Sequence, residues 1–411
     1  MRLEPAAWSW TQHLRRGGTT PWRGWTAEPL ATDGPPSGWA PPAAAQLELV
    51  RLLAGRPGAG PLLRSGAFTG LADVVLGRSA PGRGLAAAPL SWPHPAGPRV
   101  GTPPVDPADL PTTELVRAGV GVLGELLVRA SAAPAGRHRV RRPGSGPARP
   151  PLRRPFAPAF ELCGPPVVTA GLRRALAGSG HREGGRDPSV VLLAPPLDRA
   201  LTQVWSARVQ AGAPVRWRGF LDRCARRPGL PPAADYAALA RGWAQRVGPG
   251  AVHVVVAPDP TGGGTVRAVA DLLGLRLRPG VPERDLPGEP RALPPAAVDV
   301  VRRVTRVLGV RLPRDRHLDA VRRLVEVLDR PGPQPLTVPP RHRPWLLGQA
   351  ARAVEGLRAG GYAVHGDPEG VLPDTGGAPT GPRRQDVLAV VLDACLALAD
   401  PQAGAREAEQ R

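Results

Sequence analysis

The chain has 411 residues and contains no lysine, asparagine or isoleucine, whereas arginine, alanine, proline and glycine are abundant. The absence of lysine excludes a P-loop lysine on a β- or γ-phosphate, a Schiff base and a lysine general base, so a bound anion must be held by arginine, backbone N–H groups or a helix terminus. The formal net charge of +20 favours polyanion binding, although a GC-rich coding sequence is the simpler origin of this composition.

The length predicts two to three domains, at the usual ~100–200 residues per domain. Cys163, Cys224 and Cys395 have no paired spacing and no neighbouring histidine, which indicates isolated thiols in a reducing compartment. The first residues lack a continuous apolar segment, and no uncharged apolar run approaches ~18 residues. We therefore expect a soluble cytoplasmic protein without a membrane span.

Residues 1–132 are predicted to form a mostly helical module rich in tryptophan. The segment 17–22, GGTTPW, follows two arginines and could cradle an anion, but Pro21 removes a donor and no strand precedes it. We interpret this segment as a structural loop anchored by tryptophan. Leucine, valine and alanine recur at helical spacing in three ranges, 43–53, 63–76 and 112–130.

A basic segment follows the helical module. Residues 134–158 are rich in arginine, proline and glycine and contain no acidic residue, which is typical of a linker. This basic segment could bind nucleic acid electrostatically, but it lacks the interleaved aromatic residues that stack on bases. We assign residues 133–158 to a solvated linker.

Beyond the linker, short apolar runs alternate with helical patterns. Strands are predicted at 160–163, 190–193 and 253–256, and helices at 167–177, 199–209, 220–226, 236–247 and 265–273. This alternation predicts an α/β fold, with a parallel sheet, flanking helices and an active crevice at the carboxyl ends of the strands.

The remainder is predicted to be largely helical, with helices at 295–308, 315–328, 345–359 and 385–398 and a late strand within 361–367. We place residues 159–400 in one α/β domain with a helical C-terminal part. Residues 401–411 are predicted to be a disordered tail.

Three local patterns are candidates for chemistry. The turn 258–265, PDPTGGGT, follows an apolar strand, but it lacks the Walker spacing and Asp259 would repel an anion. One turn contains His181, Glu183 and Asp187, which could act in general acid–base catalysis. Turns with such polar residues are, however, common on protein surfaces. His253 opens an apolar strand and is interpreted as structural. No metal-ligand or catalytic-triad spacing rises above chance.

The order of the elements after residue 155 resembles the sulfotransferase fold, which is related to P-loop proteins, and more closely the sulfotransferase-like proteins of GC-rich bacteria. The similarity covers about residues 156–375. It is carried in order by FELCGPPVVTAGLRRAL at 160–176, SVVLLAPPLDRALTQVWSARV at 189–209, the helix around 220–223, AALARGWAQRVGPGAVHVVVAPD at 237–259, LLGL at 272–275 and GYAVHGDPEGVLP at 361–373. The resemblance implies PAPS as the sulfuryl donor.

The residues that hold PAPS in this family are mostly replaced. Gly164 and Pro166 match the opening of the phosphosulfate loop, but the chain reads VVTAG at 167–171, where the family has a basic residue, Ser, Gly, Thr and Thr. Of the two residues that contact the 3′-phosphate, Thr202 keeps the hydroxyl and Ala194 replaces the arginine. Each charge-assisted contact is worth ~1.5–3 kcal/mol, so the expected loss of affinity is about a thousandfold or more.

Two functions therefore remain open, and a third follows from charge. The favoured one is a noncatalytic relative that acts as a binding or assembly module, with an unknown protein partner or an anionic small molecule as its ligand. The alternative is a sulfotransferase-type transferase whose PAPS site has been rebuilt from five residues: Gly164, Arg173, Arg199, Thr202 and Arg208. The third is nonspecific polyanion binding, since no specific nucleic-acid motif accompanies the charge.

These hypotheses predict different geometries. Guanidinium groups that converge on the strand ends near Gly164 and Ala194 would support a rebuilt anion site. A crevice filled by Val167, Val168 and Leu172 would oppose it.

Overall fold

The computed structural model describes residues 3–25, 34–64, 70–78, 88–90, 104–132, 159–256, 263–278, 286, 289–329, 336–374 and 379–400. The chain forms two compact units. The first comprises residues 1–133, 299–328 and 383–411, and the second comprises residues 134–298 and 329–382. Each is described separately below.

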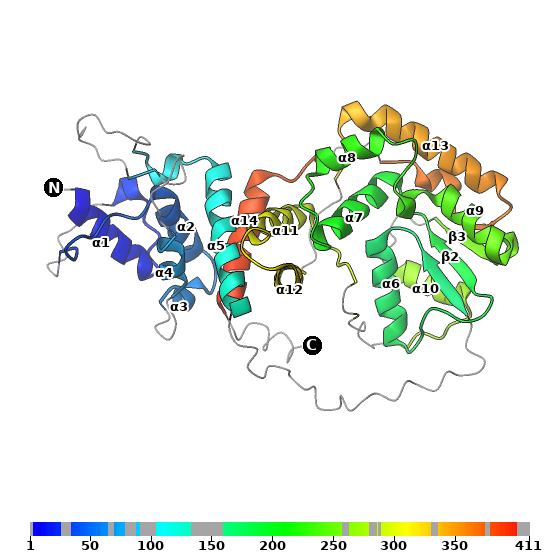
Figure 1. Ribbon diagram of the computed structural model, residues 1–411, viewed down its shortest axis with the longest axis horizontal. Coiled ribbons are helices and arrows are strands. Elements are labelled where there is room, and N and C mark those ends of the chain that lie inside the picture. Colours follow the sequence, from blue (N-terminus) through cyan, green and yellow to red (C-terminus); the bar gives the residue numbers. More distant parts are fainter. Residues whose placement is uncertain are drawn as a thin grey trace. The chain divides into compact units, whose positions relative to one another are not determined.

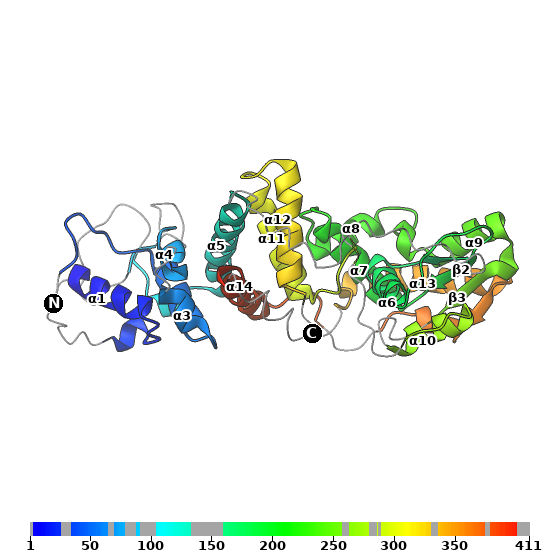
Figure 2. The ribbon, with the colours of Figure 1, turned by 90° about the horizontal axis from the view of Figure 1, so that it is seen from below.

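The first unit is built from helices. They are α1 (Leu3–Arg15), α2 (Ala44–Ala54), α3 (Ala59–Arg64), α4 (Leu71–Leu76), α5 (Thr112–Ala132), most of α11 (Pro295–Leu308), α12 (Arg314–Val327) and α14 (Arg384–Ala399), with the short 3₁₀ helices η1 (Trp22–Gly24) and η3 (Pro107–Asp109). Figures 1 and 2 show α5 and α14 side by side. Gly119 permits this packing, because a Cβ at that position would lie 2.5 Å from Cγ1 of Val391 on α14.

The second unit contains a parallel sheet of four strands, β1 (Phe160–Cys163), β2 (Ser189–Leu193), β3 (Val252–Val255) and β4 (Ala363–His365). The spatial order of the strands is the order of the chain, and each neighbouring pair is parallel. Ligands in open α/β sheets usually bind where the strand order reverses. The four described strands contain no such reversal.

Helices cover both faces of this sheet (Figure 1). The helices of the second unit are α6 (Pro166–Gly178), α7 (Leu197–Gln210), α8 (Trp217–Ala225), α9 (Tyr236–Val247), α10 (Gly263–Leu272) and α13 (Arg343–Ala359), with the 3₁₀ helices η4 (Pro232–Ala234), η5 (Pro249–Ala251), η6 (Pro340–His342) and η7 (Pro368–Val371). On one face, alternate strand residues such as Leu162 and Val191 pack against α6 and α10. On the other face, α9 packs against β2 and β3.

The observed units differ from the predicted domains. Residues 299–328 and 383–400 were assigned to the α/β domain by their position in the sequence, but they pack with the N-terminal helices. The predicted helix at 63–76 is replaced by α3 and α4, and α1 was not predicted at all. The α/β class, the parallel sheet and the flanking helices are confirmed.

Candidate functional site

The turn between β1 and α6 is the place where the resemblance puts the donor phosphosulfate. Gly164 follows the last residue of β1 and has a φ of 126°, and a Cβ there would lie 2.5 Å from the carbonyl oxygen of Leu193 on β2. Both the backbone conformation and the close approach require glycine. Packing of β1 against the end of β2 therefore accounts for Gly164 without a ligand.

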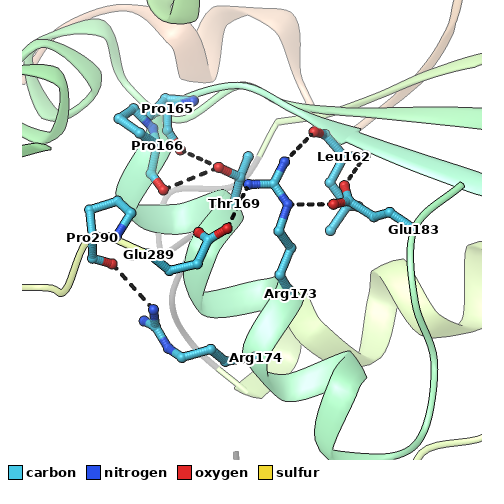
Figure 3. Close-up of polar contacts among 9 residues, drawn as sticks. All are labelled: Leu162, Pro165, Pro166, Thr169, Arg173, Arg174, Glu183, Glu289 and Pro290. Atoms are coloured by element: carbon cyan, nitrogen blue, oxygen red, sulfur yellow. Dashed lines mark hydrogen bonds and ion pairs between the residues drawn. The ribbon is translucent and has the colours of Figure 1, made fainter. Parts of the chain in front are cut away.

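The N-terminus of α6 offers few donors to an anion. Pro165 is its N-cap and Pro166 its first residue, and neither has an N–H group. The N–H of Val168 donates to Oε1 of Gln203 on α7, at 3.1 Å. The Thr169 hydroxyl lies 3.1 Å from the carbonyl oxygen of Pro165, to which it donates (Figure 3). Two of the donors expected at a helix N-terminus are thus absent and that of Val168 is already used, which leaves the N–H of Val167.

Apolar side chains fill the space behind this turn. Val167, Val168 and Leu172 are each at most 5% exposed. Val168 and Leu172 belong to the cluster that joins α6 to the sheet and includes Phe160. This is the geometry that opposes a rebuilt anion site.

Arg173 extends from α6 to the outer edge of β1, where its guanidinium group lies between Thr169 and Leu162 (Figure 3). Its Nη2 donates to the carbonyl oxygen of Leu162 at 3.1 Å, and its Nε donates to Oε2 of Glu183. The other oxygen of Glu183 accepts the N–H of Leu162 at 2.7 Å, and Glu289 Oε1 lies 3.6 Å from Arg173 Nη1. Arg173 is therefore committed to backbone and carboxylate partners.

Thr202 and Arg199 lie on the first turns of α7 beside a buried carboxylate. The Thr202 hydroxyl donates to the carbonyl oxygen of Asp198 at 3.0 Å, a contact within the helix. Asp198 is 2% exposed, and burial raises the pKa of its carboxyl group despite opposing hydrogen bonds from the backbone of Arg199, of Asp198 itself and of Asp374. The positive charge of Arg199 also opposes this rise in pKa.

Arg208 lies in the last turn of α7, nine residues beyond Arg199, which is about 14 Å along a helix. Its guanidinium group lies over the ring of Phe220, 5.3 Å from the centroid. The structure therefore does not bring Arg173, Arg199 and Arg208 together.

The turn with His181, Glu183 and Asp187 supports the edge of the sheet. Glu183 binds Leu162 as described above, and the His181 Nε2 atom lies 2.9 Å from the carbonyl oxygen of Arg276. Asp187 has a positive φ of 53°. These contacts agree with the interpretation of the turn as structural.

His253 on β3 lies beside His365 on β4. The Nδ1 atom of His253 and the Nε2 atom of His365 are 3.4 Å apart. Burial is the main cause that lowers the pKa of His253, and the charge of His365 lowers it further. Across the described ranges, no group of three or more histidine, cysteine or acidic side chains could hold a metal ion.

The GGTTPW segment forms hydrogen bonds within the first unit. Trp10 Nε1 donates to the carbonyl oxygen of Thr20 at 3.0 Å, and Arg51 Nη1 donates to that of Thr19 at 3.4 Å. The Nε2 atom of His13 lies 3.1 Å from the Thr20 hydroxyl. A loop anchored by tryptophan is consistent with these contacts.

Several predictions fall on residues outside the described ranges. They concern most of the glycine-rich turn at 258–265, the basic linker at 133–158 and the tail at 401–411. Among the helices that the structure describes, none is long and apolar enough to cross a membrane.

A surface depression of about 650 Å³ lies along the C-terminal half of α13, away from the predicted donor residues. It is lined by Ala351, Val354, Glu355, Arg358, Ala359, Glu369 and Leu372. Arg358 and Glu369, two of its three charged side chains, pair with each other at 2.8 Å.

Sequence reasoning missed a group of arginines on and around α8. Arg216, Arg218, Arg223, Arg226 and Arg227 are all exposed. The apolar side chains between them, such as Trp217 and Phe220, are buried. The signal was present in RWRGFLDRCARR at 216–227, where arginines occupy the polar side of an amphipathic helix.

Comparison with known proteins identifies no relative. No protein-family model, no curated protein and no solved structure matches this chain. The function must therefore be inferred from the residues of the site.

Proposed function

We propose that the chain is a noncatalytic relative of the sulfotransferases whose α/β unit serves as a binding module. The parallel sheet with flanking helices is compatible with this ancestry. Fold alone does not determine activity, so the proposal depends on the state of the donor site.

The observation that carries the proposal is the closed N-terminus of α6. Two prolines remove donors, Gln203 occupies the N–H of Val168, and Thr169 bonds back to its own turn. A sulfuryl donor carries several negative charges, and its transfer requires preorganised donors around the phosphosulfate. Residues 164–169 include no basic side chain, and most of the N–H donors expected at the start of α6 are absent or already used.

The alternative is a donor site rebuilt from arginines, and the geometry opposes it. Arg173 is held by Leu162 and Glu183, and Arg208 lies over Phe220 at the far end of α7. Arg199 remains beside the buried Asp198. A rebuilt site would require these side chains to leave their present partners.

Thermal unfolding with PAPS and with its desulfated product tests the proposal. A ligand at a hundred times its Kd adds about 2.7 kcal/mol of stability, so specific donor binding would give a large shift of the midpoint. We expect no saturable shift beyond that produced by ATP at equal ionic strength. ATP is the matched control, because a protein with a net charge of +20 binds many anions.

A saturable shift with PAPS that ATP does not reproduce would overturn the proposal. Two variants then locate the site. Arg199→Ala would abolish the shift if the donor lies at the strand ends, whereas Arg352→Ala, an exposed arginine on α13, would leave it unchanged.

A further inference from the structure

The surface of α8 and η6 concentrates positive charge. We name the arginine face as Arg216, Arg218, Arg223, Arg226, Arg227 and Arg341, all of which are exposed. The first five lie on α8 and at its two ends, and Arg341 lies on η6, which packs against α8. Figure 1 shows α8 beside α7 and near the start of α13.

One acidic residue lies among the arginines of this face, and it is paired with basic side chains. Asp222 on α8 lies 2.8 Å from Arg341 Nη2 and 2.9 Å from His342 Nε2. Within the described ranges, Arg216, Arg218, Arg223, Arg226 and Arg227 form no ion pair. Each therefore presents its charge to solvent and to any ligand.

Arginine is denser in the α8 segment of this face than in the chain as a whole. The chain has 54 basic and 34 acidic residues. By contrast, segment 216–227 holds five arginines and one acidic residue in twelve positions.

The ligand chemistry follows from the side chains that are exposed and from those that are not. Arginine binds phosphate through paired N–H groups. The aromatic residues of α8, Trp217 and Phe220, are 3% and 0% exposed, so α8 offers no platform on which single-stranded bases could stack. It also offers no exposed large apolar side chain that could enter a lipid layer.

We infer that the arginine face binds the phosphate backbone of double-stranded nucleic acid without reading its sequence. This inference rests on the proposed binding role and names its ligand. Affinity comes from counterion release, because each neutralised phosphate frees a condensed cation. Duplex DNA and duplex RNA present the same phosphodiester chemistry, and the experiment distinguishes them.

The test is fluorescence anisotropy of the full chain with a labelled DNA duplex and a labelled RNA duplex over a range of salt concentrations. Contact with about four phosphates predicts a slope of about −4 in a plot of log K against log salt. The variant Arg218→Gln/Arg223→Gln/Arg227→Gln should bind at least tenfold more weakly, and its slope should be smaller in magnitude by about 2 to 3.

The control variant removes the same charge elsewhere. Arg314→Gln/Arg316→Gln/Arg323→Gln changes three exposed arginines of α12 and gives the same net charge. It should bind almost as the parent does. Equal loss in the two triple variants would mean that the overall charge is responsible, and it would overturn the assignment to the arginine face.

Two other outcomes also overturn the inference. One is that neither duplex binds. The other is that vesicles containing anionic lipid bind while both duplexes fail, which would make the face a membrane contact. If the face variant fails to fold, the single change Arg218→Gln provides the same comparison with a slope smaller by about 1.

The failure of this inference can be distinguished from the failure of the proposed function. Absence of duplex binding leaves the result with PAPS unchanged. A specific shift with PAPS would overturn the noncatalytic role. It would not affect the test of duplex binding, which depends on the arginine variants.

Discussion

Arg173 and Glu183 together complete the backbone hydrogen bonding of a single residue, Leu162, on the outer edge of β1. Glu183 accepts the N–H of Leu162 and Arg173 donates to its carbonyl oxygen, while the two side chains bond to each other. In a parallel strand these two groups point to the same side, where a further strand would pair. The ion pair thus covers an edge that would otherwise invite another chain.

Arg173→Ala is expected to destabilise the protein by about 1–3 kcal/mol, because it leaves a partly buried carbonyl and the Glu183 carboxylate without their donor. Arg173→Lys should restore only part of this loss, since an ammonium group cannot reproduce the planar fork. Urea denaturation measures both changes. Arg182→Ala, an exposed neighbour, serves as the control and should leave the midpoint unchanged. An Arg173→Ala variant as stable as the parent would contradict the edge-covering role.

The elements of the α/β unit could be predicted because their signals are local. The strand at 160–163 and the helix at 236–247 have the predicted bounds, since short apolar runs and helical spacing do not depend on distant residues. The amphipathic pattern of residues 216–227 is equally local, but the pattern alone did not predict that its arginines form a charged surface.

The role of Arg173 could not be predicted, because it depends on long-range geometry. The sequence does not show that β1 lies at an edge or that Glu183 returns to it. The same limit applies to α14, whose packing against α5 joins residues about 270 positions apart. The α/β pattern therefore placed residues 383–400 in the wrong unit.

Gly164→Ala is expected to destabilise the protein by about 1–3 kcal/mol, because φ of 126° is strained for alanine and the added Cβ would meet the Leu193 carbonyl. Gly219→Ala is the matched control. Gly219 lies within α8 with nothing near its Cβ position, so alanine there should stabilise the helix by about 0.5–1 kcal/mol. Thermal or urea unfolding of the two variants gives the comparison, and a neutral effect at Gly164 would contradict the packing argument.

The three cysteines are expected to be unreactive in the folded protein. Burial is the main cause that raises the pKa of each thiol, that of Cys163 to about 11. Because the thiolate is the nucleophile, little of it exists at neutral pH. Alkylation by iodoacetamide should be slow in buffer and fast in denaturant for Cys163, Cys224 and Cys395. Rapid modification of Cys163 in the native state would show an activated thiol at the end of β1.

Asp198→Asn is expected to change how stability depends on pH. Burial raises the pKa of Asp198 above its ordinary value of 3.8, so the folded state binds the proton more tightly than the unfolded state does. The stabilising contribution of this group is therefore fully present below the unfolded pKa and is lost as pH rises through the folded pKa. Asparagine is neutral throughout, so the variant should gain stability relative to the parent as pH rises across this window.

The measurement is the difference in free energy of unfolding between Asp198→Asn and the parent, followed from about pH 4 to about pH 8. Asp235→Asn, which makes the same substitution at the partly exposed N-cap of α9, is measured alongside as the control. A constant difference for Asp198→Asn would contradict the burial argument. If the stability of Asp198→Asn relative to the parent fell as pH rose, the folded protein would stabilise the ionised carboxylate. Asp198 would then be the partner of a cation and not a buried neutral acid.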